Sequence, residues 1–531
     1  MRAPLVAIAL AACAPARTIP SVRFSTAAPV RIVDDRRDVP KPAAHPAHTD
    51  LYAIDASIER PIDRALALRP HVRARGVNAF DDVPDSTWFT NRGPLSPEQI
   101  RTGPTGDDDP EAHRPWMIAS PQVGGTSHGF IIEDARGVRY LLKFDHPGFP
   151  EVETGIDVIV DRLLWASGYN VPADFVVYVR PDELAIKPGT KLARAKVDAT
   201  FATYDHEPDG RFRAVLSRYI DGKPLGAPPF EGVRPDDAND RIPHELRRDL
   251  RGMYAVFAWL DVVDLIPGNF LDVWVADREQ PAHHYVEHYL IDFGKSLGGM
   301  GAMGRDLRRG HEFRFDLADI VGRLLTVGLV EREWVDRPIT NIRGVAALFD
   351  AASFRPGAWR PDIPYAPFEA ADAFDNYWGA KLVARFTREQ IRAAVQAGRF
   401  TDPRAIDYLT DTLVARARKT AAYWFARVVP LEHVTIDTAL CFDDLALAYD
   451  VAGTTPTRYT LATYDRSGRV LAPPVAASPR GSHTCIAVPA LADDREGYTI
   501  FALTTGRGGG TLYVHTAVDG AARRVIGIWR A

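Results

Sequence analysis

The residues of this chain with the clearest chemical potential are Asp264, Asn269 and Asp292. Asp264 and Asn269 stand five positions apart, directly after a long apolar helical pattern. Asp292 opens an Asp-Phe-Gly triplet that directly follows the short apolar run 289–291. Phosphoryl transfer requires a carboxylate beside the attacking hydroxyl, together with an amide oxygen and a second carboxylate on the metal ions that bridge the phosphates. The order and spacing of the three residues therefore favour a phosphoryl-transfer site, although either motif alone also occurs at an ordinary strand end and turn.

Upstream of these residues the sequence predicts a run of strands. The strand patterns cover 116–120, 130–133 and 138–144. The loop between the first two strands contains Gly124, Gly125 and Gly129, which suit a hairpin whose backbone approaches a ligand closely. Lys143 lies in an otherwise apolar strand. Because burial of an unpaired ammonium group is costly, we expect Lys143 to have an anionic partner.

Two amphipathic helices are predicted to position these side chains. The first has an apolar stripe at helical spacing, made of Ile156, Ile159, Val160, Leu163 and Leu164. Glu153 and Asp157 lie four positions apart on another face, and either could meet Lys143. The second helix opens at Pro243 and runs into Asp264, and we expect its arginines to form the solvent face: Arg247, Arg248 and Arg251.

The motifs resemble those of a known superfamily. Asp-x4-Asn at 264–269 followed by Asp-Phe-Gly at 292–294 resembles the catalytic and metal loops of the protein-kinase-like superfamily. The spacing Asp157, Gly168 and Pro172 is similar to that of HipA-type toxin kinases. The stretch 116–430 thus resembles a kinase-like core of the atypical branch, of HipA-type or lipid-kinase-like style, and bacterial lipoproteins share segments such as the Trp88 loop.

This resemblance implies an α+β fold with two lobes, a β-rich N-lobe at 116–225 and a helical C-lobe at 226–430. It implies that Lys143 binds the phosphates of a nucleotide such as ATP and that Glu153 or Asp157 pairs with Lys143. Asp264 would be the catalytic base, and Mg²⁺ would be held by Asn269 and Asp292. The glycines would cover the phosphates: Gly124, Gly125 and Gly129.

Several residues depart from the pattern of the superfamily. Val262 and Val263 stand where conventional kinases have His-Arg, and Asp157 stands where HipA-type kinases have a glutamate. Lys295 directly follows the Asp-Phe-Gly triplet, and no Ala-Pro-Glu segment is present. The shorter carboxylate of Asp157 leaves the choice between Asp157 and Glu153 open.

The amino terminus predicts export. Residues 1–13 join one positive charge to a short apolar run that ends in Leu10-Ala-Ala-Cys13, a pattern that resembles a bacterial lipobox with Cys13 as the acylated residue. A plain signal peptide cleaved elsewhere remains the alternative. We expect a membrane-anchored bacterial lipoprotein on the periplasmic or surface face, with a flexible tether at 14–50 and an amino-terminal extension at 51–115.

The carboxy-terminal segment and the composition complete the prediction. After Pro430 the apolar period switches to two, which predicts a small all-β sandwich domain at 431–531. Cys441 and Cys485 lie in this segment and are either a disulfide or two free thiols. The chain has 64 basic and 69 acidic residues, so nothing suggests nucleic-acid binding, and no paired Cys-x2-Cys zinc motif exists.

Three functions remain open. The first is a magnesium-dependent phosphotransferase or nucleotidyl transferase, whose donor need not be ATP because an exported protein meets little of it. The second is a catalytically idle kinase-like protein of the cell envelope that binds a nucleotide-like ligand. The third is a serine hydrolase, because Gly125-Thr-Ser127-His-Gly129 matches a nucleophile elbow, although a strand rather than the required helix follows.

Overall fold

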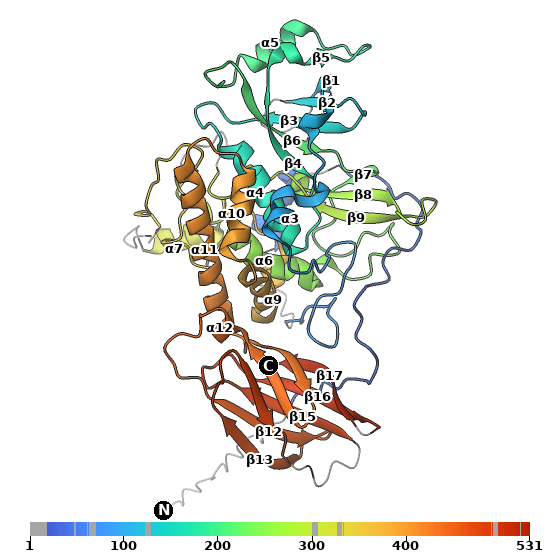
Figure 1. The fold of residues 1–531 in the computed structure, drawn as a ribbon, viewed down its shortest axis with the longest axis vertical. Coiled ribbons are helices and arrows are strands. Elements are labelled where there is room, and N and C mark those ends of the chain that lie inside the picture. Colours follow the sequence, from blue (N-terminus) through green and yellow to red (C-terminus); the bar gives the residue numbers. More distant parts are fainter. Residues whose placement is uncertain are drawn as a thin grey trace, which may run out of the picture.

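The computed structural model of the 531-residue chain describes residues 19–46, 49–60, 62, 71–122, 129–299, 306–326, 332, 334–489, 491, 497–520 and 522–531. Cys13 lies outside the described residues, as do Gly124, Gly125 and Ser127 of the glycine-rich loop. The described part is a mixed α+β structure. Among its helices, none combines the length and the apolar character that a membrane crossing requires. A six-stranded sheet lies at one end, helices lie in the middle, and two further sheets lie at the other end (Figure 1).

The six-stranded sheet has the strand order β4-β6-β3-β2-β1-β5. Its strands are β1 (Met117–Pro121), β2 (Phe130–Glu133), β3 (Arg139–Phe144), β4 (Asp174–Val179), β5 (Ala185–Ile186) and β6 (Phe212–Arg218). One face packs against α5 (Arg194–Phe201) through Phe201. The other face packs against α4 (Val152–Ser167), where Val158 of the helix meets Val176 and Val215. Lys143 of β3 pairs in register with Val215 of β6, so Lys143 lies on the face that α4 covers.

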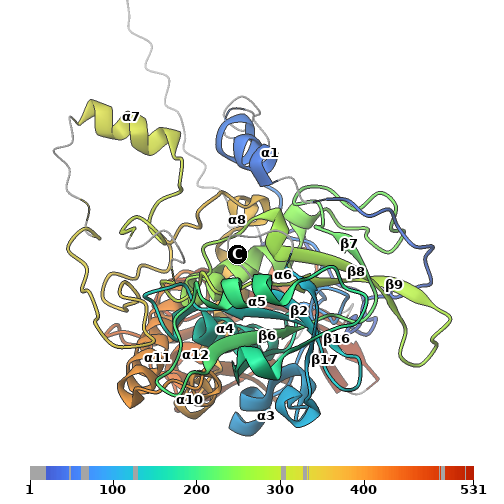
Figure 2. The same ribbon diagram turned by 90° about the horizontal axis from the view of Figure 1, so that it is seen from above.

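The central part is helical, with one small sheet. Its helices are α6 (Arg248–Leu260), α7 (Leu317–Leu325), α8 (Ala366–Ala370), α9 (Ala373–Ala384), α10 (Arg388–Ala397) and α11 (Pro403–Phe425). Its sheet has the order β7-β8-β9, from β7 (Lys223–Gly226), β8 (Phe270–Ala276) and β9 (His284–Leu290). A capping box begins α10, because Thr387 accepts from the backbone of Gln390 and the Gln390 side chain accepts from the backbone of Thr387. Seen from above, α7 stands away from the other helices (Figure 2).

The prediction for the arginines of α6 is wrong. Every residue of α6 is buried, and Arg248 and Arg251 retain 2% and 1% of their surface. Both reach Asp375 of α9, at 2.6 and 3.4 Å, and Arg247 pairs with Asp249 at 2.6 Å. Buried guanidinium groups require such partners, because an unpaired charge away from water is costly. The helix is therefore enclosed on all sides rather than half exposed.

The carboxy-terminal segment contains two antiparallel sheets and a short helix. One sheet has β10 (Leu431–Ile436), β11 (Ala439–Asp444) and β14 (His483–Ala487), and α12 (Leu445–Ala448) follows β11. The other has β12 (Tyr459–Asp465), β13 (Val470–Ala477), β15 (Tyr498–Thr504), β16 (Leu512–Asp519) and β17 (Ala522–Arg530). Phe442 and Ile486 of the first sheet share one core with Leu461 and Phe501 of the second. Cys441 and Cys485 form a disulfide between β11 and β14.

The amino-terminal segment runs along the outside of the molecule. Residues 19–46, part of the stretch that the sequence predicts as a flexible tether, are held by backbone bonds from Val39 to His284 and from His45 to Leu225. Further along are α1 (Thr49–Ile54), a π-helical turn (Asp55–Glu59) and α3 (Pro97–Thr102). The side chain of Trp88 is buried and stacks on His288 with ring centroids 3.8 Å apart, which anchors its loop.

Candidate functional site

Lys143 is the centre of a charged cluster between the six-stranded sheet and the helical part. Its Nζ lies 2.9 Å from Oδ1 of Asp292 and 3.2 Å from Oδ2 of Asp157, and its side chain is 13% exposed. Burial by itself lowers the pKa of Lys143, but the two carboxylates outweigh burial and raise that pKa above its usual range. The amine is therefore a fixed positive charge.

The acid of α4 that pairs with Lys143 is Asp157. Its side chain is 3% exposed, and its other oxygen, Oδ1, accepts a hydrogen bond from the backbone N–H of Phe293 at 2.7 Å. Asp157 therefore joins the lysine strand to the Asp-Phe-Gly segment. Glu153 lies one turn earlier, where burial raises its pKa to about 7 with the help of the carboxylates of Asp145 and Asp157.

The loop after α6 brings Asp264 and Asn269 together. The helix ends at Asp261, whose φ of 53° turns the chain into the loop. The Asn269 side chain donates to the carbonyl of Asp264 at 2.8 Å, and the backbone N–H of Ile291 donates to the carbonyl of Asn269 at 3.0 Å. These two bonds fix the loop internally and attach it to the Asp-Phe-Gly segment.

Asp292 stands in an unusual backbone conformation two residues after the end of β9. Its φ is 62°, a left-handed value that costs free energy for a residue with a side chain and that often marks a functional position. The side chain is 58% exposed, and the charge of Lys143 holds its pKa below the usual range. Together with Asp264 and Asn269 it lines a small cavity of about 10 Å³, roughly the space of one water molecule.

The structure thus brings together Lys143, Asp157, Asp264, Asn269 and Asp292, with Glu153 beside them. Three of the residues that line the small cavity, Asp264, Asn269 and Asp292, carry carboxylate or amide oxygens, which are the ligands that Mg²⁺ prefers, and the other lining residues are apolar. Asn269 and Asp292 therefore carry donor atoms that suit a magnesium ion, and their role as its ligands stays a prediction.

Of the three glycines predicted to cover the phosphates, Gly129 is the one that lies among the described residues. Gly124 and Gly125 lie outside the described residues. At Gly129, an added Cβ would stand 2.2 Å from the carbonyl oxygen of Leu142, so the glycine is required by the close packing of β3 against this position. Ser127 also lies outside the described residues, and the strand β2 begins at Phe130, where a nucleophile elbow requires a helix. The hydrolase hypothesis therefore loses its structural basis.

Sequence reasoning missed the role of Lys295. Its Nζ donates to Oδ2 of Asp264 at 2.8 Å, so a lysine that seemed only a departure from the superfamily pattern contacts the expected base. Its position directly after Asp-Phe-Gly was the available signal. A separate cavity of about 1050 Å³ is lined by the segment 218–223, Trp274 and Tyr285, among others, but by none of the clustered site residues.

Comparisons with known proteins give weak likenesses. No protein-family model and no curated protein matches the chain. Among solved structures, the Helicobacter pylori proinflammatory kinase CtkA is 11% identical with a TM-score of 0.31, and the match covers 58% of this chain and 94% of that one. The Rio2 kinase of Chaetomium thermophilum, solved as an ADP/Mg²⁺-phosphoaspartate complex, is 15% identical with a TM-score of 0.21, over 53% of this chain and 71% of that one.

Proposed function

We propose that the chain is a kinase-like phosphotransferase, or a related nucleotidyl transferase, that uses Mg²⁺ and a nucleotide such as ATP. In this proposal 116–225 is the β-rich lobe, 226–430 is the helical lobe, and 431–531 is a β-sandwich attached to them. The observation that carries the proposal is the position of Lys143. One strand amine contacts the helix acid Asp157, which is the pairing that a phosphate-binding lysine makes in this architecture, and it also lies against the Asp-Phe-Gly carboxylate of Asp292.

Each residue then has a distinct role. An acceptor hydroxyl attacks the terminal phosphorus of the donor, the bond from that phosphorus to the leaving phosphate oxygen breaks, and the hydroxyl proton passes to Asp264. Lys143 binds the phosphate oxygens, and Asp157 holds the lysine in place. Lys295 puts a second positive charge beside Asp264. Asn269 and Asp292 would hold Mg²⁺, which when bound neutralises charge on the phosphates.

One observation favours the alternative of a catalytically idle binding protein. Oδ2 of Asp264 already accepts from Lys295, which competes with an incoming hydroxyl for that carboxylate. In an idle protein the ion pair is permanent, whereas in an enzyme Lys295 moves onto the phosphates when the nucleotide binds. Turnover by the wild type, and its response to Lys295→Ala, separates the two cases.

The cellular setting in this proposal follows from the amino terminus. Acylation of Cys13 would tether the protein to a bacterial membrane, on the periplasmic or surface face. The donor there is ATP or another phosphorylated, nucleotide-like molecule. Mass spectrometry of the membrane-extracted protein would detect the acyl chains on Cys13 and an amino terminus that begins at this residue.

The test is nucleotide binding measured as a thermal shift, with and without Mg²⁺. We expect ATP or ADP with Mg²⁺ to raise the Tm of the wild type, since a ligand that binds only the folded state stabilises it. Asp292→Ala should abolish the shift, whereas Asp407→Ala, an exposed aspartate of α11, should leave it unchanged. An equal shift in the Asp292→Ala protein would contradict the proposal.

A further inference from the structure

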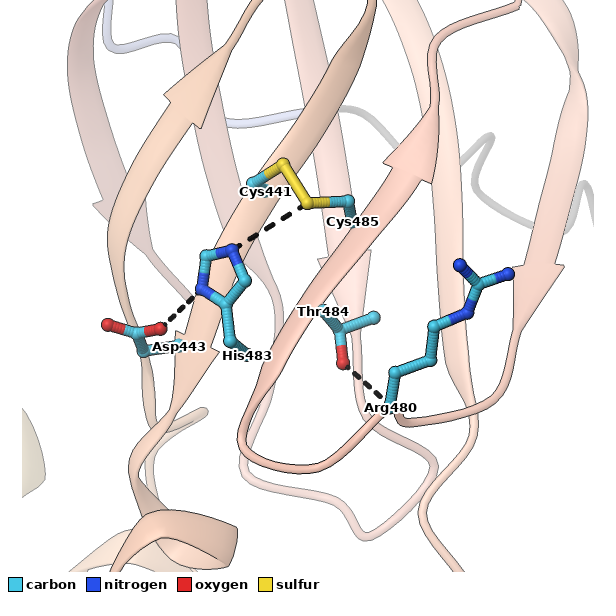
Figure 3. Close-up of a disulfide and its surroundings, with 6 residues drawn as sticks. All are labelled: Cys441, Asp443, Arg480, His483, Thr484 and Cys485. Atoms are coloured by element: carbon cyan, nitrogen blue, oxygen red, sulfur yellow. Dashed lines mark hydrogen bonds and ion pairs between the residues drawn. A yellow bond between two sulfur atoms is a disulfide. The ribbon is translucent and has the colours of Figure 1, made fainter.

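A cluster of metal-ligand side chains lies on the outer face of the sheet β10-β11-β14 (Figure 3) and shares no residue with the proposed phosphotransfer site. The strand register pairs Cys441 with Cys485 and Asp443 with His483. Because alternate residues of a strand share one face, these four side chains stand together, while their sequence neighbours point into the core. His433 of β10 joins them, with Nδ1 2.8 Å from Oδ2 of Asp443.

The contact with Asp443 orients the His483 ring as a metal ligand. Its Nδ1 lies 2.7 Å from Oδ1 of Asp443, and its Nε2 lies 3.7 Å from Sγ of Cys485 (Figure 3). An ionised carboxylate only accepts hydrogen bonds, so the proton of a neutral His483 is on Nδ1 and the lone pair of Nε2 faces the sulfurs. This carboxylate–histidine pair is the arrangement that orients histidine ligands in metal sites.

The cluster is both compact and accessible. One ligand atom from each of Cys441, His483 and Cys485 lies within 4.8 Å of the others, and no other such group of three is found among the described residues. The side chain of His483 is 63% exposed, and Cys485 is also exposed. Solvent cations and a reductant can therefore reach the site, but the disulfide uses both sulfurs as long as it is closed.

We propose that this cluster is a redox-gated binding site for Zn²⁺ or a cation of the same class. The closed state is the disulfide. A dithiol reductant gives two electrons and two protons to the Cys441–Cys485 bond, the S–S bond breaks, two thiols form, and the reductant becomes a disulfide. The cation then binds both sulfurs and Nε2 of His483, and the two thiol protons leave to solvent.

The ligand set selects the class of cation. Two thiolates and one imidazole suit a borderline-soft, tetrahedral ion such as Zn²⁺ and not Mg²⁺ or Ca²⁺. With zinc–sulfur bonds of about 2.3 Å, the two sulfurs of such a site stand about 3.7 Å apart, which side-chain rotation on neighbouring strands allows. Solvent fills the fourth position. The sequence shows none of this, because the three ligands come from two strands and lack paired Cys-x2-Cys spacing.

The experiment is a Co²⁺ titration of the full-length protein, because Co²⁺ reports thiolate ligands by a charge-transfer band in the near ultraviolet. The protein is reduced with a phosphine, which is then removed without oxygen. We expect one Co²⁺ per reduced chain with the thiolate band, displacement by one Zn²⁺, and no band in the oxidised protein. A reduced protein that gives no thiolate band would overturn the proposal.

Variants separate ligation from folding. His483→Ala and Asp443→Asn keep both cysteines, so each protein can be purified and checked as the folded disulfide form before reduction. We expect each to weaken Co²⁺ binding at least about 10-fold, the loss that even an outer-shell partner causes. His283→Ala, an exposed histidine of the β8–β9 turn, serves as the matched control and should bind as the wild type does. Wild-type affinity in the His483→Ala protein would also overturn the proposal.

Discussion

The contacts of Lys143 hold the charged residues of this site in place. A lysine in the middle of an apolar strand is costly to bury, and the chain offsets that cost with two carboxylates from distant segments. Asp157 does this with one oxygen while its other oxygen holds the backbone of Phe293. The same contacts that stabilise the amine therefore also fix the position of Asp292.

The pair of Lys143 and Asp157 can be tested by its energetics. Lys143→Met leaves the buried carboxylate of Asp157 without its cation, and loss of one partner of a buried pair typically costs about 3 kcal/mol. We expect this decrease in the free energy of urea unfolding. The double variant Lys143→Met, Asp157→Asn should recover part of the loss. If the two single effects simply add, the residues are not coupled and the assignment fails.

Because the pKa of Glu153 is raised, we expect the stability of the protein to depend on pH. Its pKa is raised to about 7 by burial, and next by Asp145 and Asp157, from an ordinary value of 4.5. A raised carboxyl pKa favours the folded state at low pH, so this contribution is complete below about pH 4.5 and is lost as the pH rises through about 7. Between pH 5 and pH 8 the wild type should lose about 1–3 kcal/mol more than Glu153→Gln in chemical unfolding. Parallel pH profiles of the two proteins would show that Glu153 does not titrate in this way.

At the scale of elements, β3, α4 and α6 position the site. The register of β3 with β6 turns Lys143 toward α4, and α6 ends where the Asp264 loop begins. The backbones of α6 and α9 are in direct contact, because an added Cβ on Gly379 would stand 1.9 Å from the carbonyl oxygen of Gly252. The small residues at this crossing allow the two helices to pack closely.

This contact makes Gly379 a sensitive position. Gly379→Ala forces α9 away from α6, and we expect a loss of about 2 kcal/mol or more in unfolding free energy, as for other overpacked cores. Gly322 is the matched control, since it is also a helical glycine and an added Cβ there meets nothing within 4 Å. Gly322→Ala should be neutral or stabilising by about 0.5–1 kcal/mol. Equal effects of the two substitutions in thermal unfolding would argue against the helix contact.

The sequence predicts the helices and strands better than it predicts which side chains they bury and which partners those side chains meet. The periodicity of α4 and α6 and the strand with Lys143 could be inferred because local patterns determine them. The burial of Arg248 and Arg251 could not, because their partner Asp375 comes from a helix more than a hundred residues later. The choice of Asp157 over Glu153 was open for the same reason. Both lie on α4, and only the packing of the helix against β3 decides which one meets the lysine.

At the scale of the whole molecule, Arg530 joins three parts of the chain. This buried residue at the end of β17 contacts Asp81 of the amino-terminal extension at 2.8 Å and Glu432 of β10 at 2.6 Å. Tyr377 of α9 stacks beneath its guanidinium group at 5.0 Å and also donates to Glu432. Since α9 packs on α6, the carboxy-terminal sheets are connected to the helix that leads to Asp264.

Arg530→Met should therefore destabilise more than one part of the protein. Its removal leaves the buried Glu432 with a single cation, Lys381 at 3.0 Å, and we expect a loss of about 3 kcal/mol. Because the parts share this junction, unfolding monitored by tryptophan fluorescence and by far-ultraviolet circular dichroism should shift together. A shift in the carboxy-terminal sheets alone would show that they unfold independently of the helices.

The central claim is that Lys143 lies against the phosphates of a bound nucleotide, and chemical labelling tests it most directly. A nucleotide with an acylated terminal phosphate transfers its acyl group to the amine beside it. The ammonium first releases a proton to solvent, its nitrogen then attacks the acyl carbon, the phosphate leaves, and peptide mass spectrometry locates the label. We expect acylation of Lys143, with Lys295 as a second site, and protection by excess Mg²⁺-nucleotide. If Lys143 stays unlabelled, or is labelled equally with excess nucleotide present, the proposed site is contradicted.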